Sequence, residues 1–195
     1  MERIVRAIES AAELPLYQEQ VLSWAPEIAA FDPGPIGALM GYDFHLGSDG
    51  PQLIEVNTNA GGAFLNVLLA RAQKRCCNPS EQSAATNQML DRFEEAVFDM
   101  FKQEWQRQSA VAMPNRIAIV DNDPESQFMF LEFELACQLL QARGIDTVIL
   151  DPSELEYIDG TLTAHGQKID MIYNRLVDFA FEDPDHVLLL SLIHI

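Results

Sequence analysis

The sequence predicts an α/β fold, because it combines a β-hairpin near residue 50 with a strand, helix and strand unit in its second half. In that second half, Arg116–Val120 and Asp146–Leu150 have the apolar content of buried strands. Between them, Phe128–Arg143 has the spacing of an amphipathic helix, and Gly144 follows it as a residue that commonly ends helices. A crossover helix of this kind returns the chain to the same sheet, so we expect the two strands to lie adjacent or one strand apart.

The hairpin is predicted from residues 42–56. Before it, the mixed-charge stretch Met1–Arg6 runs into a predicted amphipathic helix. Tyr42–Leu46 alternates and is rich in aromatic residues, Gly47–Gly50 is dense in turn formers, and Gln52–Val56 is a second apolar strand.

Three side chains with oxygen donors lie on this hairpin: Asp43, Glu55 and Asn57. Glu55 and Asn57 are two residues apart and therefore share a strand face, and closing the hairpin brings Asp43 opposite them. Two carboxylates and an amide oxygen suit Mg²⁺, although the same residues also fit the wet face of an ordinary hairpin. The paired glycines in Thr58–Gly62 favour the metal interpretation, because they let the backbone approach a ligand closely.

Two helices are expected between the hairpin and the first buried strand. They cover Ala63–Arg75 and Ala84–Gln108, with a break at Asn78–Ser80. The second has an aromatic and aliphatic stripe that we interpret as core packing: Met89, Phe93, Val97, Met100, Phe101 and Trp105. Ser109–Asn115 is interpreted as a linker, which predicts two domains over residues 1–110 and 115–195.

Turns and loops of the second half offer further candidates. Asp121–Gln127 follows a buried strand, where ligands of parallel sheets bind, and its acidic side chains suit an amine substrate. Alternatively, Asp123 or Ser126 caps the following helix. Asp159-Gly160 and His165-Gly166 are predicted to be hairpin turns.

Composition limits the classes of function. The net charge of −18 argues against nucleic acid, which needs clustered basic residues. No stretch reaches transmembrane length and no signal peptide opens the chain, so we expect neither a membrane partner nor secretion. Three cysteines without a Cys-x-x-Cys pattern predict no zinc site or disulfide framework, and favour the cytoplasm. The oligomeric state stays open, a homo-oligomer included.

The segment Gly41–Gly62 resembles the magnesium-binding end of the ATP-grasp ligases, in which an acidic residue on one strand precedes Glu-x-Asn on the next. Here the motif comes before the strand, helix and strand unit. That order is similar to circularly permuted members of the glutathione synthetase-like ATP-grasp superfamily, whose metal hairpin precedes the substrate-side domain. The resemblance covers roughly residues 36–66 and 115–185.

The resemblance implies an ATP-dependent and Mg²⁺-dependent ligase that joins a carboxylate to an amine or thiol through an acyl phosphate. It implies that Mg²⁺ bridging the ATP phosphates binds to Asp43, Glu55 and Asn57. The residues implied to line the acyl-phosphate pocket are Thr58, Asn59, Gly61 and Gly62. Arg175 is implied to contact substrate or phosphate, against the alternative that it pairs with Asp178 or Glu182.

Cationic residues are too few for a triphosphate site. Residues 1–70 contain Arg3 and Arg6 alone, and residues 115–195 contain only Arg116, Arg143, Lys168 and Arg175. The resemblance implies that the nucleotide-binding lysines lie beyond residue 195, so this chain would be an inactive fragment truncated at its carboxyl end. The alternative class is a non-catalytic α/β domain that binds a small metabolite or another subunit.

Overall fold

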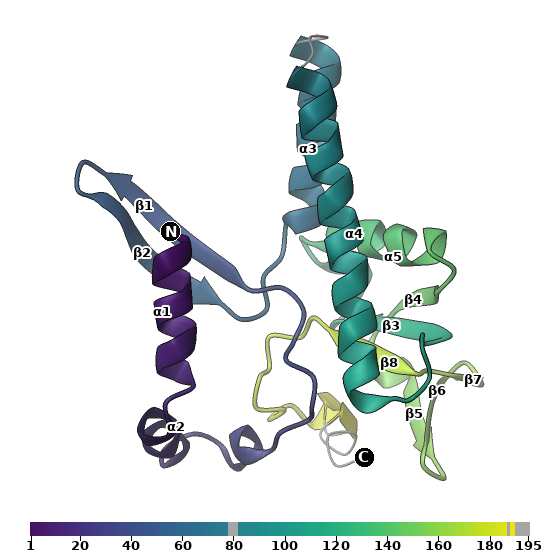
Figure 1. The fold of residues 1–195 in the computed structure, drawn as a ribbon. Helices are drawn as coiled ribbons and strands as arrows, with labels where there is room; N and C mark the ends of the chain where they lie inside the picture. Colours follow the sequence, from purple (N-terminus) through teal and green to yellow (C-terminus); the bar gives the residue numbers. More distant parts are fainter. Residues whose placement is uncertain (78–81, 187, 190–195) are drawn as a thin grey trace. The chain divides into compact units, whose positions relative to one another are not determined.

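The computed structural model describes residues 1–77, 82–186 and 188–189 and confirms the predicted α/β class (Figure 1). The chain divides into two compact units. We call them the hairpin unit, Met1–Pro33 with Leu39–Ala60, and the sheet unit, Gly34–Ala38 with Gly61–Ile195.

The hairpin unit contains two helices, a short 3₁₀ turn and one hairpin. Its elements are α1 (Glu2–Ala12), α2 (Pro15–Leu22), η1 (Glu27–Ala30), β1 (Gly41–Gly47) and β2 (Gly50–Asn57). The Tyr42 hydroxyl donates a hydrogen bond to Glu9 Oε1 at 3.2 Å, which ties β1 to α1. Partial burial, with the Glu9 carboxylate adding to it, raises the pKa of Tyr42. The unit is thinly packed, since neither α1 nor α2 has a buried residue.

The hairpin closes through Ser48 and Asp49, as the turn composition predicts, with Gly47 paired to Gly50. The register shifts once, so that Ile54 on β2 has no partner of its own on β1. This β-bulge lies between the Asp43 pair and the turn.

Over the described residues, the sheet unit contains two sheets and three α-helices. Its helices are α3 (Ala63–Cys77), α4 (Gln82–Gln108) and α5 (Phe130–Ala142), and its 3₁₀ turns are η2 (Pro124–Ser126), η3 (Pro152–Glu154) and η4 (Pro184–His186). Its strands are β3 (Arg116–Val120), β4 (Asp146–Leu150), β5 (Leu155–Ile158), β6 (Thr161–Ala164), β7 (Gln167–Lys168) and β8 (Met171–Asn174).

The parallel sheet has the strand order β4-β3-β8. Ala118 is paired with Val148 on one side and with Ile172 on the other, so the adjacency predicted for the first two strands is confirmed. After β3 the chain adds β4 on one side and then β8 on the opposite side. The sheet therefore has a topological switch point between β3 and β8.

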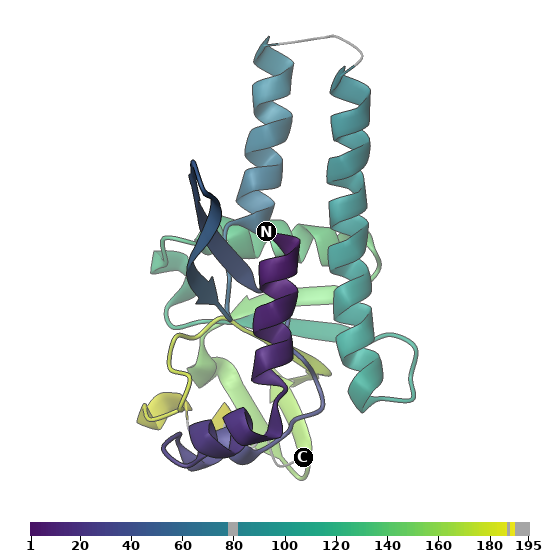
Figure 2. The same ribbon diagram turned by 60° about the vertical axis from the view of Figure 1, so that its left-hand side comes forward.

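Each face of the parallel sheet is covered, which explains why β3 is apolar from Ile117 to Val120. Residues of β3 alternate between the faces, and helices cover one of them, where Phe101 of α4 packs edge-on against Tyr173 of β8 at a centroid distance of 5.1 Å. Figure 2 shows α3 and α4 running side by side. The rings of Phe64 on α3 and Phe93 on α4 pack edge-on, with their centroids 6.5 Å apart.

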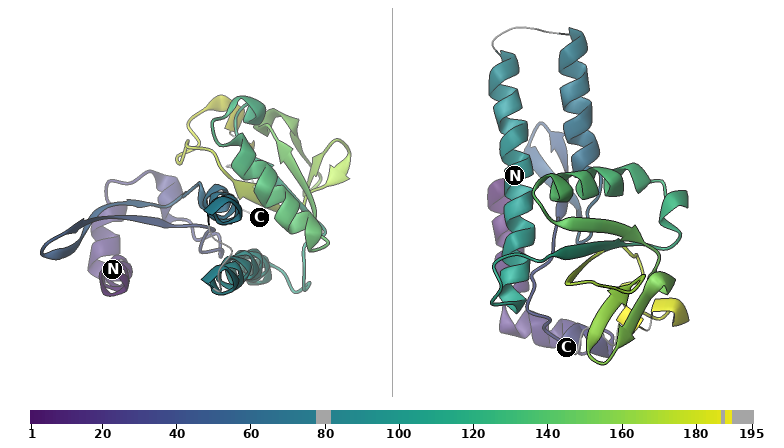
Figure 3. Two further views of the ribbon diagram at one scale, coloured as in Figure 1. Left: turned by 90° about the horizontal axis from the view of Figure 1, so that it is seen from above. Right: turned by 90° about the vertical axis from the view of Figure 1, so that its right-hand side faces the viewer.

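The antiparallel sheet β5-β6-β7 covers the other face (Figure 3). A core cluster joins the two sheets: Ala118, Val120, Leu150, Leu155, Ala164, Ile169, Leu176 and Leu189. Both predicted turns are confirmed. Asp159-Gly160 and His165-Gly166 have φ angles of 50°, 77°, 51° and 72°, the conformation that two-residue hairpin turns require.

The structure differs from the sequence expectations at several boundaries. The helix expected from Phe128 begins at Phe130, and Phe128 itself is 96% exposed. Met89, expected in the core, is 63% exposed, and the neighbouring Leu90 is buried in its place. The compact units divide between Ala60 and Gly61, whereas the linker was expected at Ser109–Asn115. The physical reason is that α3 and α4 pack with α5 inside the sheet unit.

None of the described helices combines the length and the apolar character needed to cross a membrane.

Candidate functional site

The three predicted hairpin ligands lie together. Asp43 is paired directly with Glu55 across the two strands. The Asn57 amide nitrogen lies 3.4 Å from Asp43 Oδ2 and 3.1 Å from Glu55 Oε1. The predicted convergence is therefore confirmed, and all three residues are exposed.

The position of the β-bulge explains why the alternation of side chains along the strands predicted a common face for the three residues correctly. A one-residue shift in register moves every following side chain to the other face. The extra residue, Ile54, lies on the turn side of the Asp43 and Glu55 pair, so Glu55 and Asn57 keep a common face with Asp43.

The chemistry of this trio fits a hard divalent cation. Two carboxylates placed directly opposite each other on a hairpin repel, and a cation between them would remove that repulsion. The Asn57 side chain donates to both carboxylates through Nδ2, and a turn of this amide would bring its oxygen into the set as the third ligand. Among the side chains that the structure describes, those of residues 1–73, 87–186 and 188–189, no three of His, Cys, Asp or Glu gather as a metal group, and this trio has two carboxylates plus an amide.

The segment Thr58–Gly62 crosses the division between the two units. Thr58 and Asn59 belong to the hairpin unit, and Gly61 and Gly62 belong to the sheet unit. Gly62 has a φ of 85°, which favours glycine, and its carbonyl accepts a hydrogen bond from the Asn66 side chain at 2.8 Å.

Arg175 lies against Gly61. A Cβ added at Gly61 would lie 3.1 Å from Arg175 Nη2 and 3.0 Å from Met129 Cε, so the absence of a side chain at position 61 lets both side chains approach the backbone closely. Arg175 is 9% exposed as a residue, and its guanidinium donates to the Tyr173 hydroxyl at 3.3 Å and lies 5.4 Å from the centre of that ring. Two residues implied by the resemblance, 114 positions apart in the chain, therefore lie together in the sheet unit.

A buried glutamate fixes the helix that follows the glycines. Glu132 on α5 is 3% exposed, and its carboxylate accepts the backbone amides of Phe64 at 3.1 Å and Leu65 at 2.9 Å. The amino terminus of α3, a potential anion site, is thus already bound to a carboxylate of the chain itself. Glu132 was not among the residues predicted from the sequence. The available signal was its position on the helix, because it lies four residues before Ala136 on the buried face of α5.

The loop Asp121–Gln127 follows β3 at the switch point. The capping alternative does not hold here: Asp123 makes no side-chain cap bond, and the Ser126 hydroxyl donates to the Asp123 carbonyl. Burial raises the pKa of Asp121, against the opposing effects of the Asn122 amide, Arg175 and His186.

An open cavity of ≈620 Å³ lies beside this loop. Four acidic residues contribute to its lining: Asp123, Glu125, Asp151 and Glu154. Phe130 and Ile149 add apolar surface. The Asp151 carboxylate accepts the Ser153 amide and hydroxyl and the Asp123 amide, which lower its pKa against the effect of burial.

Asp178, one of the two carboxylates expected as alternative partners of Arg175, binds a histidine and two backbone amides. Asp178 binds His186 Nδ1 at 2.7 Å and accepts the backbone amides of Glu182 and Asp183. These hydrogen bonds lower the pKa of Asp178 to about 2, and the bond from the Asp183 backbone amide has the largest effect. No role was predicted for His186, because its partners Asp178 and Asn122 come close to it only in the folded chain.

No family model matches the chain, and no curated protein matches it.

Proposed function

We propose that this chain is part of an ATP-dependent and Mg²⁺-dependent ligase that joins a carboxylate to an amine or a thiol. The observation that carries the proposal is the convergence of Asp43, Glu55 and Asn57 on one face of the hairpin. The spacing of these residues matches the acidic residue and Glu-x-Asn pattern of the ATP-grasp ligases.

Asp43, Glu55 and Asn57 would hold the ion. When bound, Mg²⁺ supplies positive charge to the phosphates of ATP and orients them. The hairpin itself contributes a preformed donor set, because the strand pairing already places the two carboxylates opposite each other.

The contact between Gly61 and Arg175 gives a second line of support. Phosphoryl transfer to a carboxylate develops negative charge, and a fixed cation beside the reacting group stabilises it. Arg175 is held by Tyr173 and by the close packing at Gly61, so its charge has a defined position next to the glycine turn. We assign Gly61 and Gly62 to the lining of the acyl-phosphate pocket, with Thr58 and Asn59 before them.

The reaction would proceed in two steps. A substrate carboxylate attacks the γ-phosphorus of ATP, giving an acyl phosphate and ADP; the amine or thiol then attacks the acyl carbon and releases phosphate. The acidic cavity beside Asp123 and Glu125 has the charge to attract an amine. The lysines that hold the nucleotide are expected outside residues 1–195, and the proposed compartment is the cytoplasm.

A second candidate is a non-catalytic domain that binds a small cationic metabolite. The observation that favours it is that residues of the sheet unit alone line the ≈620 Å³ cavity, so such binding would not need the hairpin.

Magnesium titration followed by amide NMR shifts tests the metal site. We expect saturable shifts at residues 43, 55 and 57, and an affinity about tenfold or more lower in Glu55→Gln. Asp49→Asn is the matched control, because it removes a carboxylate from the turn of the same hairpin. Equal weakening by both substitutions, or no shifts at the trio, would refute the assignment.

A further inference from the structure

Helix α1 of the hairpin unit has an apolar face whose members recur at helical spacing: Ile4, Ala7, Ile8 and Ala11. Together with Arg3 they line an open hollow of ≈540 Å³, and among the described residues only those of α1 contribute to this lining. No residue of α1 is buried, so the apolar face stays open within the hairpin unit.

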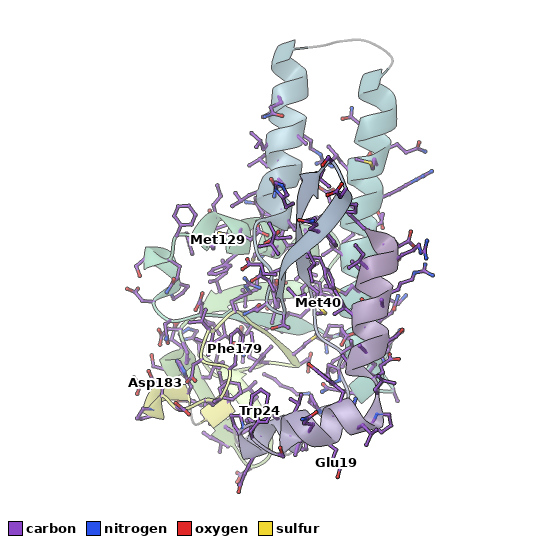
Figure 4. All side chains as sticks on the ribbon, turned by 90° about the vertical axis from the view of Figure 1, so that its left-hand side faces the viewer. Glu19, Trp24, Met40, Met129, Phe179 and Asp183 are labelled. Atoms are coloured by element: carbon purple, nitrogen blue, oxygen red, sulfur yellow. The ribbon has the colours of Figure 1, made fainter. Side chains whose placement is uncertain are left out.

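An open face of this kind is a candidate for an interaction surface. A surface helix gains most of its stability by packing its apolar stripe against another apolar surface, and exposed apolar patches mark interaction sites. The hairpin unit leaves further apolar side chains largely exposed. Leu16 is at the start of α2, and Trp24, which Figure 4 labels, lies just after that helix.

We propose that the apolar face of α1 binds the same face of a second copy of this chain, with the two helices antiparallel. The interface would be isologous, so that each copy contributes the same residues to it. It involves neither the donor trio of the hairpin nor Arg175, and it is therefore independent of the proposed ligase function.

The side chains of the face have complementary sizes in this arrangement. A two-fold axis between Ala7 and Ile8 places the alanine of each copy opposite the isoleucine of the other. The same axis places Ile4 opposite Ala11 of the second copy. Each isoleucine then meets an alanine and fills the space that the small side chain leaves. In a parallel pair, isoleucine would face isoleucine and alanine would face alanine.

The charges of α1 favour the antiparallel direction. Arg3 lies in the first turn and lines the hollow, whereas Glu13 is the residue that caps the carboxyl end. The helix dipole disfavours both positions within one helix, because cations are stabilising at the carboxyl end and anions at the amino end. In an antiparallel pair, Arg3 lies beside Glu13 and the last carbonyls of the second copy. The arrangement that is unfavourable in one helix becomes favourable between two.

The charge of the chain argues against a lipid bilayer, the other surface that amphipathic helices bind. Helices that lie on membranes are rich in Lys and Arg and bind anionic lipid. The net charge here is −18, and residues 1–70 contain Arg3 and Arg6 as their only basic residues. Between two copies, physiological salt limits the overall repulsion to distances of about 8 Å, so the contacts at the interface itself decide the association.

Sedimentation equilibrium of the purified chain in physiological salt tests the association. The helix is short, so we expect a weak dimer with a Kd of roughly 10–1,000 μM. Ala7→Glu places a carboxylate at the centre of the face and should weaken the dimer about tenfold or more. Ser10→Glu is the matched control, because it adds the same charge to an exposed position of α1 outside the hollow. It should leave the Kd unchanged.

A charge exchange tests the direction of the pair. Arg3→Glu alone should weaken the dimer about threefold or more, and Glu13→Arg added to the same chain should restore it, because the exchanged charges attract again. Arg3→Glu agrees with the dipole of α1, so loss of the helix cannot explain its effect. In a parallel pair Arg3 would face Arg3, and this substitution would bring neither the loss nor the rescue.

Four results would overturn the proposal. The first is a dimer that Ala7→Glu leaves intact, and the second is a dimer without the charge rescue. The third is a chain that stays monomeric at about 1 mM and loses stability in Ala7→Glu, which would mean that its own remaining residues cover the face. The fourth is binding of the monomer to phosphatidylcholine vesicles that Ala7→Glu abolishes, which would assign the face to a lipid surface.

Discussion

Gly61 and Arg175 lie so close together that a single methyl group on the glycine would reach 3.1 Å from the guanidinium nitrogen Nη2. The contact joins the glycine turn to the residue that follows β8, and a side chain at position 61 would have to displace the end of Arg175 or of Met129 by a few tenths of an ångström.

We predict that Gly61→Ala destabilises the sheet unit by about 1–3 kcal/mol, because the added methyl group must displace Arg175 or Met129. Urea unfolding measures the change. The control is Gly47→Ala, where the nearest atom would be His45 Cδ2 at an ordinary 3.7 Å. If both substitutions change the free energy of unfolding by the same small amount, the close contacts at Gly61 do not limit the size of the side chain at that position.

Glu132→Gln should cost about 1–3 kcal/mol of unfolding free energy, because one of the two oxygens that accept the α3 amides becomes an amide nitrogen with no acceptor facing it. The measurement is the same denaturation experiment, with Glu134→Gln on the same helix as the control. Loss of stability only in the control would rule out the helix-capping role of Glu132.

The acid stability of the loop after β8, residues 175–186, should follow the ionisation of Asp178. Its folded pKa of about 2 is below the ordinary value of 3.8, so its contribution to stability is present above about pH 4 and is lost as the pH falls toward 2. Hydrogen exchange at residues 182 and 183 between these pH values checks the prediction. In Asp178→Asn this pH dependence should disappear, and a wild-type loop that stays protected at pH 2 would contradict it.

Calorimetric titration of residues 1–195 with ATP and Mg²⁺ should show weak binding at most, and no ligase turnover. The stretches that carry the candidate site have few cations, and Mg²⁺ on an exposed hairpin keeps most of its water. Titration with Mg²⁺ alone is the control for the heat of metal binding. Tight stoichiometric ATP binding would show that the nucleotide site lies within this chain.

Local patterns predicted the elements well, because each depends on few neighbouring residues. Alternation and turn composition predicted the hairpin and its trio, and helix periodicity with Gly144 predicted the α5 crossover between β3 and β4. The bulge at Ile54 has no comparable sequence signal. The predicted common face of Asp43, Glu55 and Asn57 is correct only because the bulge lies between Glu55 and the turn.

Residues that act across long sequence separations could not be predicted. Glu132 binds amides 67 and 68 positions away, and His186 binds Asn122 across 64 positions. Neither has a local motif, since a carboxylate in a helix or a histidine after a proline turn is ordinary until the fold supplies its partner. The packing of α3 and α4 with the sheet unit is likewise a tertiary contact, which the linker composition at Ser109–Asn115 does not encode.

The bulge divides the hairpin into the part that carries the three donor residues and the part that ends in the turn. Four residue pairs lie between the Asp43 and Glu55 pair and the turn, with the bulge at their start. Lengthening the turn at Ser48 and Asp49 would therefore leave the register of the trio untouched. That makes the tip a natural place to insert a fluorescent or paramagnetic reporter, which could sense metal occupancy from a short distance without disturbing the donors.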